Sequence, residues 1–424
     1  MSLFNITEHT IPASHIREFA RATATSQDET LLLAVKQYVP KDNPTPQRGD
    51  LTVIGAHANG FPKELYEPLW DEFYHEAQRL GIRIRSIFIA DAAWQGRSGI
   101  LNEGKLGNDP GWNDYARDII QLVNHFRPPP PLLAVGHSFG GNSLTNAALL
   151  HPRLFSVGLV LLDPVIGHYD YNPSTVRLSP AALSVNRRDV WPSRDEAAAS
   201  FRRSKFYQAW DPRVLDRWIE FGLRDVAPAA ATAATPVTLA TTKHQEIFTF
   251  LRPSWPAFNA DGSKVIHQER CPDLDDTLNP SVSNWPLYRA EGGNTMVRLP
   301  SVRPAVLYII GGQSFTTQPD VVCERTAITG TGTGGSGGAA QSRVKQVTHP
   351  DHGHLIPMEA PAYCARHAAE WAKGELDRWW AEEKEYDEWT KKPLAEKTTV
   401  SDEYRRYLGV KDGNGTRTQP KPKI

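Results

Sequence analysis

The chain lacks an excess of charge of either sign. Its 424 residues include 47 lysines and arginines against 48 aspartates and glutamates, which gives a formal net charge of −1. Proteins that bind a nucleic-acid backbone or an anionic membrane surface carry a basic surplus, because they must balance phosphate charges. We therefore expect a small molecule, and no nucleic acid, as the partner of this chain.

Cysteines, long apolar runs and a leader segment are also scarce or missing. The three cysteines are an odd number spread over a long chain, so they predict no disulfide framework and favour a reducing compartment. The longest apolar run, residues 157–162, is too short to span a bilayer, and the N-terminal residues lack the basic and apolar segments of a secretory signal. These absences predict a soluble intracellular protein with a sizeable core.

The first third of the chain alternates short apolar runs with amphipathic periods. Residues 64–80 and 112–126 place apolar side chains at steps of three or four, which predicts helices. Apolar runs bounded by Pro, Gly or charged residues predict strands at residues 31–38, 51–55, 82–90, 131–135 and 157–162, and again much later at residues 305–310 and 344–347. Strands alternating with helices predict an α/β fold with a mostly parallel sheet.

The alternation stops between the strands at residues 157–162 and 305–310. This segment is rich in Ala, Arg, Pro and aromatic residues, with helical stretches near residues 194–210 and 212–223. Because strands on both sides complete one sheet, we expect an insertion that covers the sheet. The predicted core has two parts, at residues 1–163 and 304–375. Between them, residues 164–303 are predicted to form a large, mainly helical cap. Residues 376–424 are predicted to form a charged helix followed by a disordered tail.

The strongest chemical signal is the sequence Gly-His-Ser-Phe-Gly at residues 136–140. An apolar strand precedes it and a helix of small and apolar residues follows it, as a nucleophile elbow requires. Such a turn would hold Ser138 in a strained conformation with its hydroxyl exposed, next to the free N–H groups of a helix start. A second Gly-x-Ser-x-Gly match, at residues 334–338, has neither flanking element and is predicted to be a flexible surface loop.

A serine hydroxyl needs a base to remove its proton, and in this layout a histidine returns after the last strand. His349, His352 and His354 lie there, and His354 best fits a loop that leads into a helix. Clustered histidines can also bind a metal, but they lack the neighbouring cysteines or helical spacing of a zinc site. We therefore predict His354 as the base, with no metal and no cofactor.

The third member of a triad is a carboxylate that orients the imidazole. Asp163 directly follows the predicted strand at residues 157–162. After the strand at residues 305–310 the next acid is Asp320, ten residues into a loop. Because a strand end is the more rigid platform, Asp163 is favoured and Asp320 is the alternative.

An oxyanion hole needs two N–H donors. The first is predicted at Phe139, directly after the serine. The second is expected in the small-residue loop after the strand at residues 51–55, where Asn59 is favoured and Gly60 is the alternative.

Several further stretches resemble one group of fungal proteins. They are residues 4–9, 14–18, 62–71, 104–107, 112, 116–118 and 161–165. In these stretches the chain is similar to fungal α/β-hydrolases of the peroxisomal lipase, toxin-biosynthesis and mycophenolic acid acyl-CoA hydrolase type. The resemblance covers most of the chain and implies an α/β-hydrolase fold and a serine thioesterase or esterase of secondary metabolism, with the acid at the position of Asp163.

Two positions depart from that family. Ala58 follows His57 where the family has His-Gly, and the chain ends in Pro422-Lys423-Ile424 where a peroxisomal signal reads Ser-Lys-Leu. The tripeptide keeps the basic middle residue and the apolar last one. We therefore expect a peroxisomal location, with the cytoplasm as the alternative.

The predicted function is hydrolysis of an acyl thioester of a polyketide- or fatty-acid-like metabolite by Ser138, His354 and Asp163. A carboxylesterase, lipase or lactonase is the alternative, because oxygen esters pass through the same kind of tetrahedral intermediate. A non-hydrolytic cyclase is a third hypothesis. Arginines of the predicted cap are candidates for binding coenzyme A phosphates, but they are more simply explained as solvated helix faces; they are Arg187, Arg188, Arg202 and Arg203. Aromatic residues of the cap are candidates for the walls of an acyl pocket, although ordinary packing of the cap on the core explains most of them; they are Phe201, Phe206, Trp210, Trp218 and Phe221.

Overall fold

The computed structural model describes residues 3–167, 179–226, 235–274, 284–314 and 318–409. Residues 1–376 form one compact unit and residues 377–424 a second. No helix within the described ranges is long and apolar enough to cross a membrane. The predicted peroxisomal address, Pro422-Lys423-Ile424, lies outside the described residues and stays a prediction.

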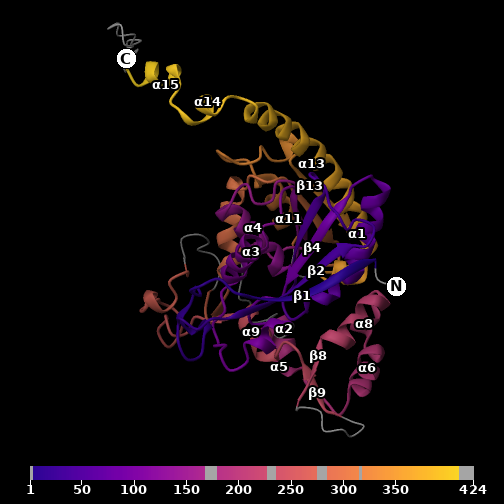
Figure 1. Cartoon of the computed structure of the whole chain (residues 1–424). Helices are drawn as coiled ribbons and strands as arrows, with labels where there is room; N and C mark the ends of the chain where they lie inside the picture. The colour runs from indigo at the N-terminus through magenta and orange to yellow at the C-terminus, as the bar shows by residue number, and fades with distance from the viewer. Residues whose placement is uncertain (1–2, 168–178, 227–234, 275–283, 315–317, 410–424) are drawn as a thin grey trace. The chain divides into compact units, whose positions relative to one another are not determined.

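The first unit is built on an eight-stranded sheet with the order β1-β2-β4-β3-β5-β6-β12-β13 (Figure 1). From β4 to β13 the strands run parallel, whereas β2 is antiparallel to both of its neighbours. The mostly parallel sheet predicted from the sequence is therefore confirmed. The strands are β1 (Phe4–Pro12), β2 (Leu32–Pro40), β3 (Leu51–Ala56), β4 (Ile84–Ala90), β5 (Leu132–His137), β6 (Gly158–Leu162), β12 (Val306–Gly311) and β13 (Val344–His349).

Strand β1 was not predicted from the sequence. It pairs with β2 along its whole length, from Phe4 opposite Pro40 to Pro12 opposite Leu32. Most of its side chains are exposed, and only two positions near its ends are buried. An edge strand of this kind shows no alternation of apolar and polar residues, so the hydrophobic pattern could not reveal it.

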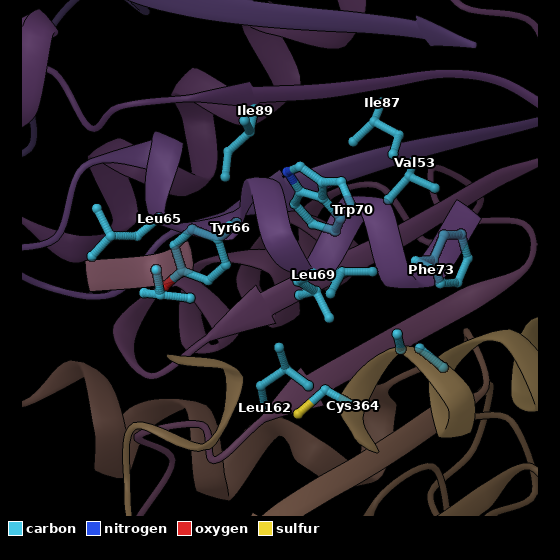
Figure 2. Packing of buried hydrophobic residues seen from close by; sticks show 14 of the residues in the cluster. Val53, Leu65, Tyr66, Leu69, Trp70, Phe73, Ile87, Ile89, Leu162 and Cys364 are labelled. Carbon is cyan, nitrogen blue, oxygen red and sulfur yellow. The ribbon is translucent and has the colours of Figure 1, made fainter. Parts of the chain in front are cut away.

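Helices cover both faces of the sheet, and alternate residues of each strand point to opposite faces. On one face Val53 and Ile87 pack with Trp70 and Phe73 of α1, as Figure 2 shows, and with alanines of α13. The other face packs against α3 and α4, with Tyr115 among the residues involved. The helices of the sheet layers are α1 (Glu67–Arg79), α2 (Gly96–Leu101), α3 (Trp112–Phe126), α4 (Phe139–Leu150), α11 (Pro319–Ile328), α12 (Ile356–Glu359) and α13 (Pro361–Thr390).

Between β6 and β12 lies the segment predicted as a cap. Its helices are α5 (Pro180–Asn186), α6 (Arg194–Arg203), α7 (Lys205–Gln208), α8 (Pro212–Phe221), α9 (Lys243–Phe250) and α10 (Glu291–Arg298). Short strands in this segment form two small sheets that the sequence did not predict. One sheet consists of β7 (Val190–Trp191), β8 (Leu223–Asp225) and β9 (Val237–Leu239). The other consists of β10 (Arg252–Pro253) and β11 (Leu287–Tyr288). Strands of two or three residues are too short to show a period.

The glycine-rich segment at residues 330–338 differs from the flexible loop that its composition predicts. Backbone N–H groups of Gly330, Gly332 and Ser336 donate to the carbonyl groups of Leu299, Pro300 and Val302, at 2.9, 2.9 and 3.0 Å. These bonds tie the segment to the chain before β12. Its glycines serve close backbone contacts, and the Gly-x-Ser-x-Gly match at residues 334–338 follows no strand and leads only into a single 3-10 turn at Ala339–Gln341.

The described part of the second unit contains the end of α13, followed by α14 (Leu394–Thr398) and α15 (Asp402–Tyr407). The charged helix predicted after the core is therefore present. The tail predicted to be disordered, from residue 411, lies outside the described residues.

Candidate active site

Ser138 occupies the turn between β5 and α4. Its backbone has φ 58° and ψ −124°, a strained conformation for a residue with a side chain. The turn is tight enough to require its glycines. A Cβ on Gly136 would lie 2.5 Å from Leu144 Cδ1, and one on Gly140 would lie 2.5 Å from the carbonyl oxygen of His57. The local geometry is that of a nucleophile elbow.

Three predicted residues meet at the carboxyl edge of the sheet. His354 Nε2 lies 2.9 Å from Ser138 Oγ, and His354 Nδ1 donates to Asp163 Oδ2 at 2.6 Å. The register of the sheet explains the meeting, because His137, at the end of β5, lies opposite Leu162, at the end of β6. The residues that follow these two strands are therefore neighbours. The His354 side chain keeps 11% of its surface exposed, whereas Asp163 is fully buried.

The alternatives considered for the triad lie elsewhere. Asp320 is exposed in the first turn of α11, where its carboxylate accepts the Val321 N–H at 3.0 Å. The ring of His349 lies against that of His352, with 4.3 Å between centroids and a tilt of 53°. Within the described ranges, no group of three His, Cys, Asp or Glu side chains is placed to share a metal ion.

Asp163 has a second partner that the sequence did not predict. Ser314 Oγ, three residues beyond β12, donates to Asp163 Oδ2 at 2.5 Å. Burial alone would raise the pKa of Asp163, but the hydrogen bonds from His354 and Ser314 and the nearby His354 charge bring it below its ordinary value. Asp163 is thus held as a carboxylate. In the sequence, the role of Ser314 is indicated only by its position after β12, the strand next to β6.

The loop after β3 offers one backbone donor that is not already used. The Gly60 N–H donates to Gln95 Oε1 at 2.8 Å, which rules against this alternative. The Asn59 side chain is fixed from two sides, by Gln95 at 2.6 Å and by the backbone carbonyl of Glu246 at 2.9 Å. Among the described residues no acceptor faces the Asn59 N–H. Phe139 begins α4, where N–H groups have no acceptor within the helix.

Ala58 stands where the resembled family has glycine, and the structure shows why alanine is tolerated. Its φ is not positive, so no glycine is needed. The neighbouring His57 is buried and donates from Nδ1 to the Ala58 carbonyl at 2.8 Å, while its Nε2 accepts the Ala92 N–H at 2.8 Å. Burial lowers the pKa of His57, so the imidazole stays neutral. Its two hydrogen bonds hold the loop after β3 in place.

His137 is a further buried group that sequence reasoning did not single out. Its Nδ1 lies 2.9 Å from Tyr66 Oη, and its Nε2 lies 2.8 Å from the backbone oxygen of His354. Burial and the neighbouring His354 lower the pKa of His137 to about 3. It is therefore a neutral link between the elbow and the histidine loop.

Comparison with known proteins identifies the family of the chain. The sequence pattern of the serine aminopeptidase S33 family of hydrolases matches residues 71–212. The type I acyl-CoA thioesterase mpaH of Penicillium roqueforti is 41% identical over 409 residues, which cover 91% of each chain. The chain belongs to this family of fungal α/β-hydrolases.

More distant relatives share the fold. The abhydrolase domain-containing protein AFT2-1 of Alternaria alternata is 30% identical over 251 residues, 59% of this α/β-hydrolase and 86% of that protein. The solved peroxisomal α/β-hydrolase Lpx1 of Saccharomyces cerevisiae has a TM-score of 0.65 at 17% identity, with 96% of each chain covered. A thioesterase domain from the curacin biosynthetic pathway has a TM-score of 0.51 at 13% identity, covering 86% of this chain and 99% of that one.

The segment of this α/β-hydrolase that is predicted to be a cap contacts the loop that carries Asn59. Glu246 of α9 accepts from Ser184 Oγ at 2.6 Å and from Arg187 Nη1 at 2.8 Å, both from the region of α5. A Cβ on Gly60 would lie 3.0 Å from the Glu246 carboxyl carbon, so the carboxylate lies against the loop. Arg187, a candidate for binding coenzyme A phosphates, is therefore already paired with a carboxylate.

The aromatic residues of the cap are mostly packing residues. Trp210 and Trp218 are buried, and their rings lie 5.5 and 6.0 Å from that of Phe61, next to the Asn59 loop. Phe201 is buried beside Trp218, whereas Phe206 is half exposed. The cluster joins the cap to the sheet layers of the α/β-hydrolase.

Proposed function

We propose that this α/β-hydrolase is a serine thioesterase that cleaves an acyl-CoA thioester of a polyketide- or fatty-acid-like metabolite. The observation that carries the proposal is that Asp163 is hydrogen-bonded to His354 and His354 to Ser138, which is the arrangement of a catalytic triad. The substrate class is supported by the type I acyl-CoA thioesterase mpaH, which matches the chain over 91% of its length.

In the proposed reaction Ser138 Oγ attacks the thioester carbonyl while His354 Nε2 takes its proton. The N–H groups of Phe139 and Asn59 stabilise the oxyanion that forms. The tetrahedral intermediate expels the thiolate of coenzyme A, which receives the proton from His354. Asp163 holds the imidazole by Nδ1 and stabilises its charged form. Water, activated by His354, then attacks the acyl-enzyme and releases the free acid.

An oxygen ester is the second candidate substrate, because the same three residues can cleave both thioesters and oxygen esters. The discriminating measurement is kcat/KM on acyl-CoA and on ester substrates with the same acyl group. A preference for the thioester across chain lengths is expected. A consistent preference for the ester would replace the thioesterase with a carboxylesterase, lipase or lactonase.

The proposed nucleophile is tested by Ser138→Ala. We expect this variant to lose several orders of magnitude in thiol release from acyl-CoA, because nucleophile and base act as a unit. A fluorophosphonate probe should label the wild-type chain at Ser138 and leave the variant unlabelled. Near-normal turnover by Ser138→Ala would reject the mechanism.

A further inference from the structure

Three loops of the candidate active site are joined by one chain of hydrogen bonds. The Ala58 N–H donates to Tyr66 Oη at 2.8 Å, and Tyr66 Oη lies 2.9 Å from His137 Nδ1. His137 Nε2 in turn lies 2.8 Å from the backbone oxygen of His354. Each of these four groups belongs to a buried or nearly buried residue, so water does not compete for the bonds.

The protons in this chain can be arranged in one way only. A carbonyl oxygen accepts, so His137 Nε2 must carry a proton and donate to His354. Because burial keeps His137 neutral, its Nδ1 is bare and accepts the Tyr66 hydroxyl proton. The Tyr66 oxygen is then free to accept the Ala58 N–H. All three bonds run in the same direction and satisfy every group involved.

Three members of this series of hydrogen bonds lie next to, or belong to, residues of the proposed mechanism. Ala58 directly precedes Asn59, the proposed oxyanion donor, and His137 directly precedes Ser138. The last acceptor is the backbone of His354 itself. A shift in any one of the three loops would therefore stretch a bond to the others.

We propose that His137 and Tyr66 are positioning residues that fix the nucleophile, the base and the oxyanion donor relative to one another. This inference rests on the proposed function. The two side chains do not touch the reacting atoms. They hold Ser138, His354 and the Asn59 N–H in the geometry that the transition state requires, where a displacement of about 1 Å costs roughly 10²-fold in rate.

The test compares kcat and KM for acyl-CoA hydrolysis in Tyr66→Phe and His137→Phe. Each variant keeps an aromatic ring and loses the hydrogen bonds. We expect kcat to fall by about 10- to 100-fold with KM changed by less than about threefold, because substrate contacts are untouched. His137→Gln should recover part of the loss, since an amide presents a donor and an acceptor side by side as the imidazole does.

Tyr308→Phe is the matched control. Tyr308 is also fully buried, and its hydroxyl is hydrogen-bonded to Thr329 Oγ1 at 2.8 Å, outside the three loops. It should lower the melting temperature by a similar amount and leave kcat unchanged. Thermal unfolding followed by circular dichroism gives the comparison of stability.

The outcomes separate this inference from the proposed function. If the wild-type chain does not cleave thioesters or esters, or if Ser138→Ala does, the proposed function fails. A second case is that the wild-type chain is active and Ser138→Ala is inactive, as the proposed function requires. If Tyr66→Phe and His137→Phe then have the same kcat as the control Tyr308→Phe, only the positioning role is overturned. Should His137→Phe fail to fold, Tyr66→Phe decides, because it removes a single oxygen atom.

Discussion

At the scale of the residue, Asp163 shows how a buried charge is kept in place. Its backbone φ of 41° is strained, and its carboxylate is enclosed. Hydrogen bonds from His354 and Ser314 to one oxygen, Oδ2, offset the cost of burial and lower its pKa. The position of the proposed acid thus depends on Ser314 as well as on the histidine that it orients.

Ser314→Ala tests this dependence. Because the folded-state pKa of Asp163 is lowered, its ionised form contributes stability above its ordinary pKa of about 3.9, and this contribution is lost as the pH falls through the folded-state value. Removing the Ser314 hydroxyl raises that folded-state pKa. The variant should therefore be less stable than the wild-type chain near neutral pH and should lose less stability on acidification, so that the two stabilities converge at low pH, with kcat reduced by about tenfold.

Melting temperature measured across acidic pH, together with kcat, checks the Ser314 prediction. Ser336→Ala, in the glycine-rich segment, is the control and should leave kcat and the pH dependence of the melting temperature unchanged, because among the described residues its hydroxyl accepts only the Gly338 N–H. Identical acid profiles for Ser314→Ala and the wild-type chain would show that the Ser314 hydrogen bond does not affect Asp163.

The sequence could predict Ser138, His354 and Asp163 because each follows a recognisable strand. Tyr66, Gln95 and His137 could not be assigned in the same way. Their contacts join segments far apart in the chain, and no motif marks a buried side chain that binds a distant backbone group. Such partners become visible only when the packing is known.

At the scale of the element, prediction succeeded where periodicity is strong and failed where it is weak. The helix expected at residues 112–126 has the bounds of α3, because its apolar face repeats regularly. The helix expected at residues 194–210 is broken at Ser204, whose extended backbone ends α6 and caps α7. Strand β1 escaped notice because most of its side chains are exposed.

Alanine substitution at two helical glycines is expected to have opposite effects on stability. A Cβ on Gly140 of α4 would lie 2.5 Å from the His57 oxygen and 2.7 Å from the Ala56 oxygen, whereas one on Gly374 of α13 would meet no atom within 4 Å. Gly140→Ala should lower the free energy of unfolding by about 1–3 kcal/mol and reduce activity, since it pushes on the loop of the oxyanion donor. Gly374→Ala should raise that free energy by about 0.5–1 kcal/mol.

Chemical denaturation of the two alanine variants checks the glycine prediction. Gly374→Ala serves as the control for activity and should retain the wild-type kcat. Equal changes in unfolding free energy at the two positions would mean that the close approach of α4 to the end of β3 is not required.

At the scale of the whole molecule, every residue of the proposed mechanism lies in the first compact unit, residues 1–376. The hydrogen-bonded partners His354 and Asp163 are 191 positions apart, and His354 and Ser138 are 216 apart. They meet because parallel strands align their carboxyl ends. The long insertion between β6 and β12 changes their spacing in the sequence and leaves the sheet intact.

A chain shortened to end at Lys392 tests this division. It keeps α13 and loses residues 393–424, which include α14 and α15. We expect kcat and KM on acyl-CoA within about twofold of the full chain, because a deletion in a separate unit leaves the hydrogen bonds of the first unit in place. A large loss of kcat in a folded protein would show that the second unit takes part in the reaction.

The late position of β12 also has a consequence for synthesis. The ribosome makes the proposed nucleophile 216 residues before its base, which at about 5–20 residues per second is roughly 10–40 s. For much of that interval, until β12 (Val306–Gly311) is made, the edge of β6 that pairs with β12 has no partner strand. The nascent chain is therefore open to mispairing at this edge until β12 emerges, and it stays inactive until His354 emerges.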